Sequence, residues 1–126
     1  MKKYKNGSIK GRKGNVKITF DTEGKTETRD ITAKEVFDLI MSQVKITTLN
    51  DSLQGIRILD ALDEATKTGY IEIEEGCHDW LKPKLTFTGK DGEKANLCSA
   101  IFRYDGNEIN DFILEGYEKP KQSKEE

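Results

Sequence analysis

The sequence predicts a small α+β domain in which an N-terminal β-hairpin, two central helices, short strands and one or two C-terminal helices surround a single core. Three observations support this fold class. Apolar and polar side chains alternate over residues 15–20, as in a half-buried strand, whereas apolar side chains recur at helical spacing over residues 36–44 and 53–65. The chain has 126 residues, a length that fits one domain.

Residues 15–31 are predicted to form the β-hairpin. The first strand, residues 15–20, contains β-branched side chains, which favour extended backbone. Residues 21–25 are rich in turn-forming side chains and include Gly24, which can adopt a positive φ. Residues 26–31 would then return as the second strand.

The first central helix is predicted to begin after Thr32. Glu35 follows Thr32 by three residues, which is the spacing of a capping box. The helix is expected to end near Val44, because β-branched residues follow it. Its apolar side chains at helical spacing are Val36, Leu39, Ile40 and Val44.

The second central helix is the densest apolar segment and is predicted to be the centre of the core. Asn50 or Asp51 can cap its start, and Gly69 is well placed to end it in a left-handed conformation. The apolar side chains that give it a broad face are Leu53, Ile56, Ile58, Leu59, Leu62 and Ala65.

The remaining elements are shorter. Residues 70–74 alternate, which predicts a strand with Ile71 and Ile73 directed inward. Residues 77–82 are predicted to form one helical turn that Pro83 ends. The last elements predicted are a strand at residues 85–88, a loop at 89–94, and two helices within 95–115 that are separated at 105–107.

Charge divides the chain into a basic start and an acidic remainder. The net charge is −2, and residues 1–14 contain six cations and no acid, so the rest of the chain has a net charge of −8. We predict a flexible basic arm at residues 1–14, a single α+β domain at 15–117 and a disordered tail at 118–126. The six cations are Lys2, Lys3, Lys5, Lys10, Arg12 and Lys13.

The basic arm is a candidate contact for nucleic acid or for another protein subunit, because clustered cations can follow a phosphate backbone or an acidic surface. A solubilising segment without a specific partner is the alternative. A second candidate site is a protein-docking surface. It comprises the acidic Glu72, Glu74 and Glu75 together with Trp80, since tryptophan is enriched among interface anchors. A partly buried core position is the alternative for Trp80.

Catalytic and metal sites are not predicted. The tripeptide Cys77-His78-Asp79 contains suitable residue types, but adjacent side chains diverge in a helix or a strand. The sequence has one histidine and no paired Cys or His spacing, so neither a metal nor another cofactor is expected. Cys77 and Cys98 are predicted to be free thiols. The chain is therefore interpreted as a non-enzymatic protein, and no small-molecule substrate is indicated.

Location is inferred from what the sequence lacks. No apolar run approaches the roughly 18 residues that would span a bilayer. The basic start is not followed by the apolar stretch of a signal peptide. We therefore expect a cytoplasmic protein with no membrane partner.

Part of the chain resembles small accessory proteins encoded by tailed bacterial viruses. The resemblance extends over residues 53–113 and rests on the second helix together with residues 70–74, 79–82, 101–102 and 109–113. It implies a viral or prophage context, in which the protein would act in virion assembly or on a host factor and would lie in the bacterial cytosol or the virion. It assigns a function to none of the residues.

Two functions follow as hypotheses. The first is a protein-interaction or assembly protein, whose partner is another copy, another subunit or a host protein. The alternative is a nucleic-acid-binding protein that uses residues 1–14. The acidic remainder of the chain weighs against this alternative, because dedicated nucleic-acid binders usually have a basic face on the fold itself.

Overall fold

The computed structural model describes residues 2–115 and has the predicted α+β architecture. Its helices are α1 (Ala33–Gln43), α2 (Leu49–Thr68), α3 (Glu75–Lys84), α4 (Leu97–Phe102), the 3₁₀ turn η1 (Arg103–Asp105) and α5 (Gly106–Glu115). Its strands are β1 (Lys2–Lys5), β2 (Lys10–Gly11), β3 (Gly14–Asn15), β4 (Lys17–Thr22), β5 (Lys25–Asp30), β6 (Tyr70–Ile73), β7 (Thr86–Thr88) and β8 (Lys94–Asn96).

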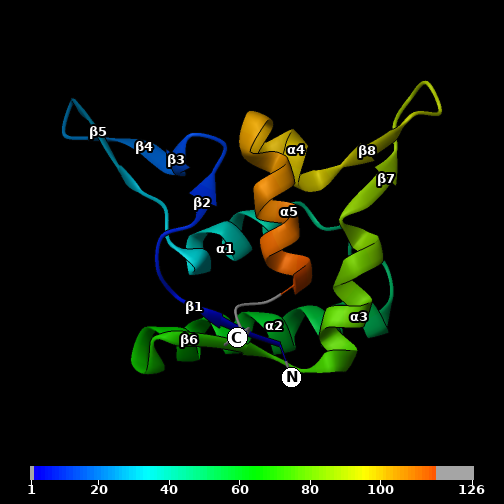
Figure 1. Cartoon of the computed structure of the whole chain (residues 1–126). Helices are drawn as coiled ribbons and strands as arrows, with labels where there is room; N and C mark the ends of the chain where they lie inside the picture. The colour runs from blue at the N-terminus through cyan, green and yellow to red at the C-terminus, as the bar shows by residue number, and fades with distance from the viewer. Residues whose placement is uncertain (1, 116–126) are drawn as a thin grey trace, which may run out of the picture.

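The strands pair in antiparallel two-stranded ladders rather than in one sheet. β1 pairs with β6, β2 with β3, β4 with β5 and β7 with β8. The β4–β5 and β7–β8 hairpins project on either side of α4 and α5, whereas β1, β6 and α2 lie together at the other end of the molecule (Figure 1).

Tyr4 belongs to the hydrophobic core, and its side chain is completely buried. Its ring lies 5.0 Å from that of Phe37 and 5.2 Å from that of Phe112, measured between centroids. Its hydroxyl donates a hydrogen bond of 2.6 Å to the carbonyl oxygen of Ile113. Burial raises the pKa of Tyr4, so the hydroxyl keeps the proton that it donates. Tyr4 thus joins β1 to both α1 and α5.

The predicted flexible arm at residues 1–14 is wrong for the residues that the structure describes. β1 pairs with β6 from Lys2 opposite Ile73 to Lys5 opposite Tyr70, and Ile9 is buried as Tyr4 is. This pairing and this burial offset the cost of ordering a polar segment. The domain therefore includes residues 2–14 and does not begin at residue 15. The tail predicted at 118–126 lies outside the described residues.

The hairpin and the first central helix are confirmed. Glu23 and Gly24 both have positive φ, 49° and 80°, as a two-residue type I′ turn between β4 and β5 requires. The Thr32 side chain accepts from the backbone N–H of Glu35 at 3.3 Å. The Glu35 carboxylate in turn accepts from the Thr32 backbone N–H at 2.9 Å. The C-cap of α1 is Val44, which is where the sequence predicted the end of the helix.

α2 begins earlier than predicted. Its N-cap is Thr48, not Asn50 or Asp51, because Asp51 occupies the third position of a second capping box. The Asp51 carboxylate accepts from the backbone N–H of Thr48 at 3.1 Å, and the Thr48 hydroxyl accepts from the backbone N–H of Asp51 at 3.0 Å. The predicted end is confirmed, since Gly69 has a φ of 83° and its N–H donates to the carbonyl of Ala65.

The C-terminal half follows the predicted order with shifted boundaries. Ile71 and Ile73 are buried, as expected. α3 runs through Pro83 to Lys84, so Pro83 does not end the helix as predicted; the helix ends one residue later, where the backbone N–H of Leu85 donates to the carbonyl of Lys82 at 3.2 Å. Residues 94–96, which end the predicted loop and begin the segment 95–115, form β8 against β7. Both predicted C-terminal helices are present as α4 and α5.

The break between α4 and α5 lies at Arg103–Asp105 instead of 105–107. Gly106 is the first residue of α5. A Cβ at this position would lie 2.6 Å from the Cα of Ser99 in α4, so a larger residue would not fit. The glycine therefore permits the close approach of two helices and does not interrupt one.

Candidate interaction surface

Helix α2 has two apolar faces. The inner face, formed by Gly55, Ile58, Leu62 and Ala65, is buried against the rest of the domain. The opposite face is exposed and begins in the segment before the helix. We call this set the outer stripe; its members and the exposed fractions of their side chains are Ile46 (42%), Leu49 (90%), Leu53 (47%), Ile56 (54%) and Leu59 (44%).

The outer stripe borders a shallow hollow between the end of α1 and α2. The hollow has a volume of about 250 Å³. Gly55 lies at the floor of the hollow. A Cβ at this position would fill part of the space and would be in ordinary van der Waals contact with Met41 and Ile46. The residues that line the hollow are Met41, Ile46, Ser52, Gly55, Ile56 and Leu59. The surface therefore combines a projecting side chain, Leu49, with an apolar recess.

The prediction that α2 is the centre of the core is wrong for its outer half. Its apolar side chains do not form one broad face, because successive residues in a helix are rotated by about 100°. Leu53, Ile56 and Leu59 consequently lie away from Ile58 and Leu62. A helical wheel of the sequence separates these two sets of side chains, but it does not indicate which set packs against the rest of the domain.

The start of α2 is fixed by a buried carboxylate. Asp51 accepts hydrogen bonds from the backbone N–H of Thr47 at 3.0 Å and from the Trp80 indole N–H at 2.9 Å. It also pairs with the ammonium group of Lys84 at 3.1 Å. These contacts, above all the Thr47 hydrogen bond, hold the pKa of Asp51 well below its usual range. Asp51 therefore ties α3 to the first turn of α2.

Trp80, predicted as a docking anchor, is half-buried in this arrangement. Its indole N–H is bonded to Asp51, and the Lys84 ammonium lies 5.5 Å from the centre of its ring. The contacts made by Trp80 thus lie within the domain and attach α3 to α2.

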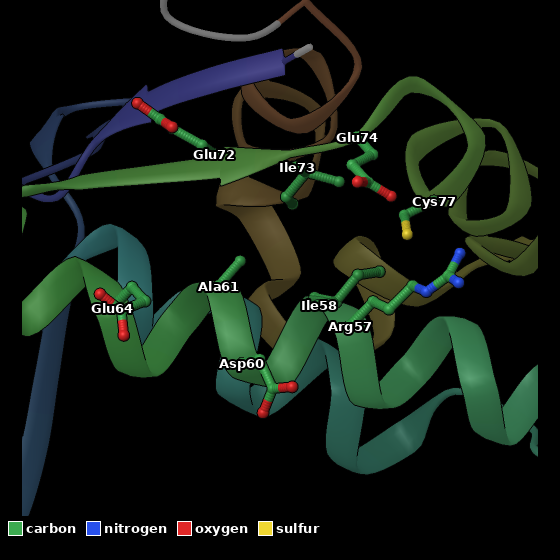
Figure 2. Close-up of a pocket in the computed structure, with 9 residues that line it drawn as sticks. All are labelled: Arg57, Ile58, Asp60, Ala61, Glu64, Glu72, Ile73, Glu74 and Cys77. Atoms are coloured by element: carbon green, nitrogen blue, oxygen red, sulfur yellow. The ribbon is translucent and has the colours of Figure 1, made fainter.

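The acidic residues predicted for docking are exposed but point in different directions. Glu72 lies on β6 and its carboxylate is 3.9 Å from the Lys3 ammonium on β1. Figure 2 shows Glu72 directed toward β1 and away from α2, whereas Glu74 is directed toward Cys77. Glu75 is exposed in the first turn of α3. These carboxylates are close in sequence without forming one cluster.

A second hollow, of about 390 Å³, lies between α2, β6 and the start of α3 (Figure 2). Arg57, Glu74 and Cys77 gather at one end of it. The Cys77 thiol donates to the side-chain oxygen of Gln54 at 3.0 Å. Burial, with the nearby Glu74 charge, raises the pKa of Cys77 despite the opposing effect of Arg57. The sulfur is therefore held as a thiol, which is a poor nucleophile.

The neighbours of Cys77 do not form a reacting group with it. The His78 imidazole is buried, and its Nε2 donates to the carbonyl of Ile113 at 3.0 Å, while Asp79 is exposed. Cys98 is a free, fully buried thiol, and burial raises its pKa to about 11. Among residues 2–115, no group of three or more His, Cys, Asp or Glu side chains could hold a metal ion.

The six basic residues predicted to form one contact surface lie on two separate elements. Lys2, Lys3 and Lys5 belong to β1, whereas Lys10, Arg12 and Lys13 belong to β2 and its turn to β3. β1 and β2 lie well apart (Figure 1). The Lys3 ammonium is 4.6 Å from the centre of the Tyr70 ring, and the Arg12 backbone N–H donates to Asp105 at 2.8 Å. The cations are thus not gathered along a single extended arm.

None of the helices within residues 2–115 is both long and apolar enough to cross a membrane. Comparisons with protein-family models, with curated proteins and with solved structures found no match.

Proposed function

We propose that this chain is a non-enzymatic interaction protein that binds another protein chain through the outer stripe of α2. The observation that carries the proposal is the exposure of five neighbouring aliphatic side chains. Four of them follow one another at helical spacing on α2, and Ile46 lines the same hollow as Ile56 and Leu59. Together they present on the order of 400 Å² of apolar area, which is the size of the largest apolar patch on a typical monomeric protein, and such patches are often functional. Isolated exposed leucines need no explanation, but a contiguous group does.

The regular structure of α2, the helix that presents the outer stripe, favours binding. α2 is 20 residues long, has a capping box at its start and ends at a glycine in the left-handed conformation. The surface is therefore already formed before a partner binds, so binding does not include the free-energy cost of ordering it. An apolar helix face beside a shallow hollow also suits recognition of another amphipathic helix.

The resemblance of residues 53–113 to accessory proteins of tailed bacterial viruses supports a setting for this function. In such a setting the partner is a component of the viral particle, a host protein or a second copy of the chain. The resembling segment includes most of α2 and three of the stripe side chains, Leu53, Ile56 and Leu59.

A tagged pull-down tests the proposal. The tagged chain is incubated with a bacterial lysate that also contains an untagged copy, with and without nuclease, and retained proteins are identified by mass spectrometry. We expect nuclease-resistant retention of a protein by the wild type. The double variant Leu53→Glu/Ile56→Glu should lose it, because two charges would have to be buried in an apolar contact.

The matched control is Tyr104→Glu, which changes a side chain that is 82% exposed on η1. It should retain what the wild type retains. Equal capture by the wild type and by the double variant would contradict the proposal. Capture that disappears with nuclease would support the nucleic-acid alternative and direct attention to β1 and β2.

A further inference from the structure

We propose that the partner of the outer stripe is a second copy of this chain, bound through an antiparallel α2–α2 contact centred on Ile56. This inference rests on the proposed function and specifies its partner. It rests on three properties of the outer stripe: the spacing of its side chains, the charged residues that follow it toward the C-terminus of α2, and its apolar area.

The stripe is nearly symmetric about Ile56. Leu53 and Leu59 lie three residues before and after it, and all three side chains are about half exposed. When two antiparallel helices meet at a twofold axis beside Ile56, Leu53 of each copy lies at the same height along the contact as Leu59 of the other, and the two side chains occupy opposite flanks of Ile56. One patch then supplies both sides of the contact, as a twofold dimer requires.

Charge selects the antiparallel orientation. On the helix surface the stripe is continued toward the C-terminus by Asp60 and Asp63, both exposed. In the antiparallel register these carboxylates lie beside Ser52 and Leu49 of the other copy, in the first turn of its α2. The start of a helix bears the positive end of its dipole, which attracts carboxylates, and the carboxylate already in this turn, Asp51, is buried and paired with Lys84. A parallel contact would instead set each aspartate against its own counterpart, which like charges disfavour.

The area agrees with that of a stable dimer. A standard interface covers about 800 Å² on each partner, of which somewhat more than half is apolar, or about 450 Å². The whole chain has an accessible surface of 7940 Å², so such an interface would take about a tenth of it. The stripe supplies on the order of 400 Å² of apolar area, and the half-buried Met41 beside it adds to this.

Sedimentation velocity over a range of concentrations tests the pairing. We expect the wild type to approach twice the 14.3 kDa mass of one chain as its concentration rises. Leu53→Glu/Ile56→Glu should remain a single chain at every concentration, and Tyr104→Glu should behave as the wild type. Circular dichroism of each variant verifies that it is folded.

The outcome separates this inference from the proposed function. A wild type that remains at 14.3 kDa at every concentration overturns self-pairing. If such a monomer still retains a different protein through the outer stripe, the proposed function stands with another partner. If it retains none, both fail.

A cysteine cross-link tests the register. Ile56→Cys places a thiol at the proposed axis, where two copies approach closely enough for a disulfide under mild oxidation with diamide. Lys67→Cys is the control, because its two copies would lie about 33 Å apart at 1.5 Å per residue. The native Cys77 and Cys98 are buried. A covalent dimer with Ile56→Cys alone is expected, whereas cross-linking at residue 67, or none at 56 in a dimeric sample, overturns the antiparallel register.

Discussion

β1 and α2 lie on the two sides of the same strand, β6, and they distribute their apolar side chains in opposite ways. β1 has a single large apolar side chain, Tyr4, and buries all of it. α2 has many, yet it leaves Leu49, Leu53, Ile56 and Leu59 in solvent. The segment that is poorer in apolar residues thus contributes to the centre of the core, and the richer one contributes to both the core and the surface.

The difference shows that burial depends on where an element's faces point. β1 is ordered by backbone hydrogen bonds to β6, so one inward side chain is enough to place Tyr4 between α1 and α5. α2 is covered by the domain on one side only, and its inner face is buried from Asp51 to Ala65. An apolar face that remains uncovered after folding is available for a second chain.

The largest effect is expected at Tyr4. Tyr4→Ala should lower the free energy of unfolding by about 3–5 kcal/mol, because it leaves a cavity between Phe37 and Phe112. Tyr4→Phe should cost only about 1 kcal/mol, since the carbonyl of Ile113 keeps the hydrogen bond from His78. Urea unfolding measures both variants. A cost below about 1 kcal/mol for Tyr4→Ala would mean that β1 does not belong to the core.

A matched pair within α2 tests its two faces. Ile58→Ala removes a buried side chain and should cost about 2–5 kcal/mol. Ile56→Ala removes one that is 54% exposed and should change the stability of the dilute monomer by about 0.5 kcal/mol or less. Thermal unfolding at low protein concentration compares the two. Equal costs would show that the two faces of α2 are not distinguished as the structure describes.

A smaller effect than that of Ile58→Ala is expected at Glu35, which caps α1 beside the β4–β5 hairpin. The hydrogen bond from Arg29 is the first cause that lowers the pKa of Glu35, to about 2 from 4.5. A carboxylate with a lowered pKa stabilises the folded state above pH 4.5, and this stabilisation is lost as the pH falls toward 2. Solvent screens the pair, so we expect about 1 kcal/mol or less.

Glu35→Gln isolates this contribution. Other carboxylates, Asp51 among them, titrate in both proteins, so the difference between the two unfolding curves belongs to Glu35. We expect the variant to be less stable than the wild type at pH 6 and to approach it at pH 2.5. A difference that does not change with pH would show that the Arg29–Glu35 pair is not formed in solution.

The parts of the fold that the sequence predicts correctly depend on local signals. The turn at Gly24, the capping box at Thr32 and the end of α2 at Gly69 each depend on residues that are neighbours in the chain. The burial of Tyr4 depends on a partner strand about 70 residues away, and β8 likewise depends on its pairing with β7. Composition does not contain such long-range pairings.

The candidate surface was partly readable from the sequence. The sequence predicts that Leu53, Ile56 and Leu59 belong to an apolar face, but it places them in the core together with Ile58 and Leu62. Trp80 and Lys84 turn inward to Asp51, although a tryptophan in a polar segment favours an exposed anchor. Only the positions of α1, α3 and β6 around α2 decide which of its faces remains free of the domain.

Solvent accessibility of the α2 methyl groups tests the central claim most directly. The chain is labelled at its Leu and Ile methyls, and their NMR signals are recorded with a soluble paramagnetic chelate at low and high protein concentration. At low concentration, we expect the chelate to broaden the signals of Leu53 and Ile56 and to leave those of Ile58 and Leu62 sharp. At high concentration, Leu53 and Ile56 should become protected. Equal broadening of all four at low concentration would contradict the two-faced helix, and continued broadening of Leu53 and Ile56 at high concentration would contradict self-pairing.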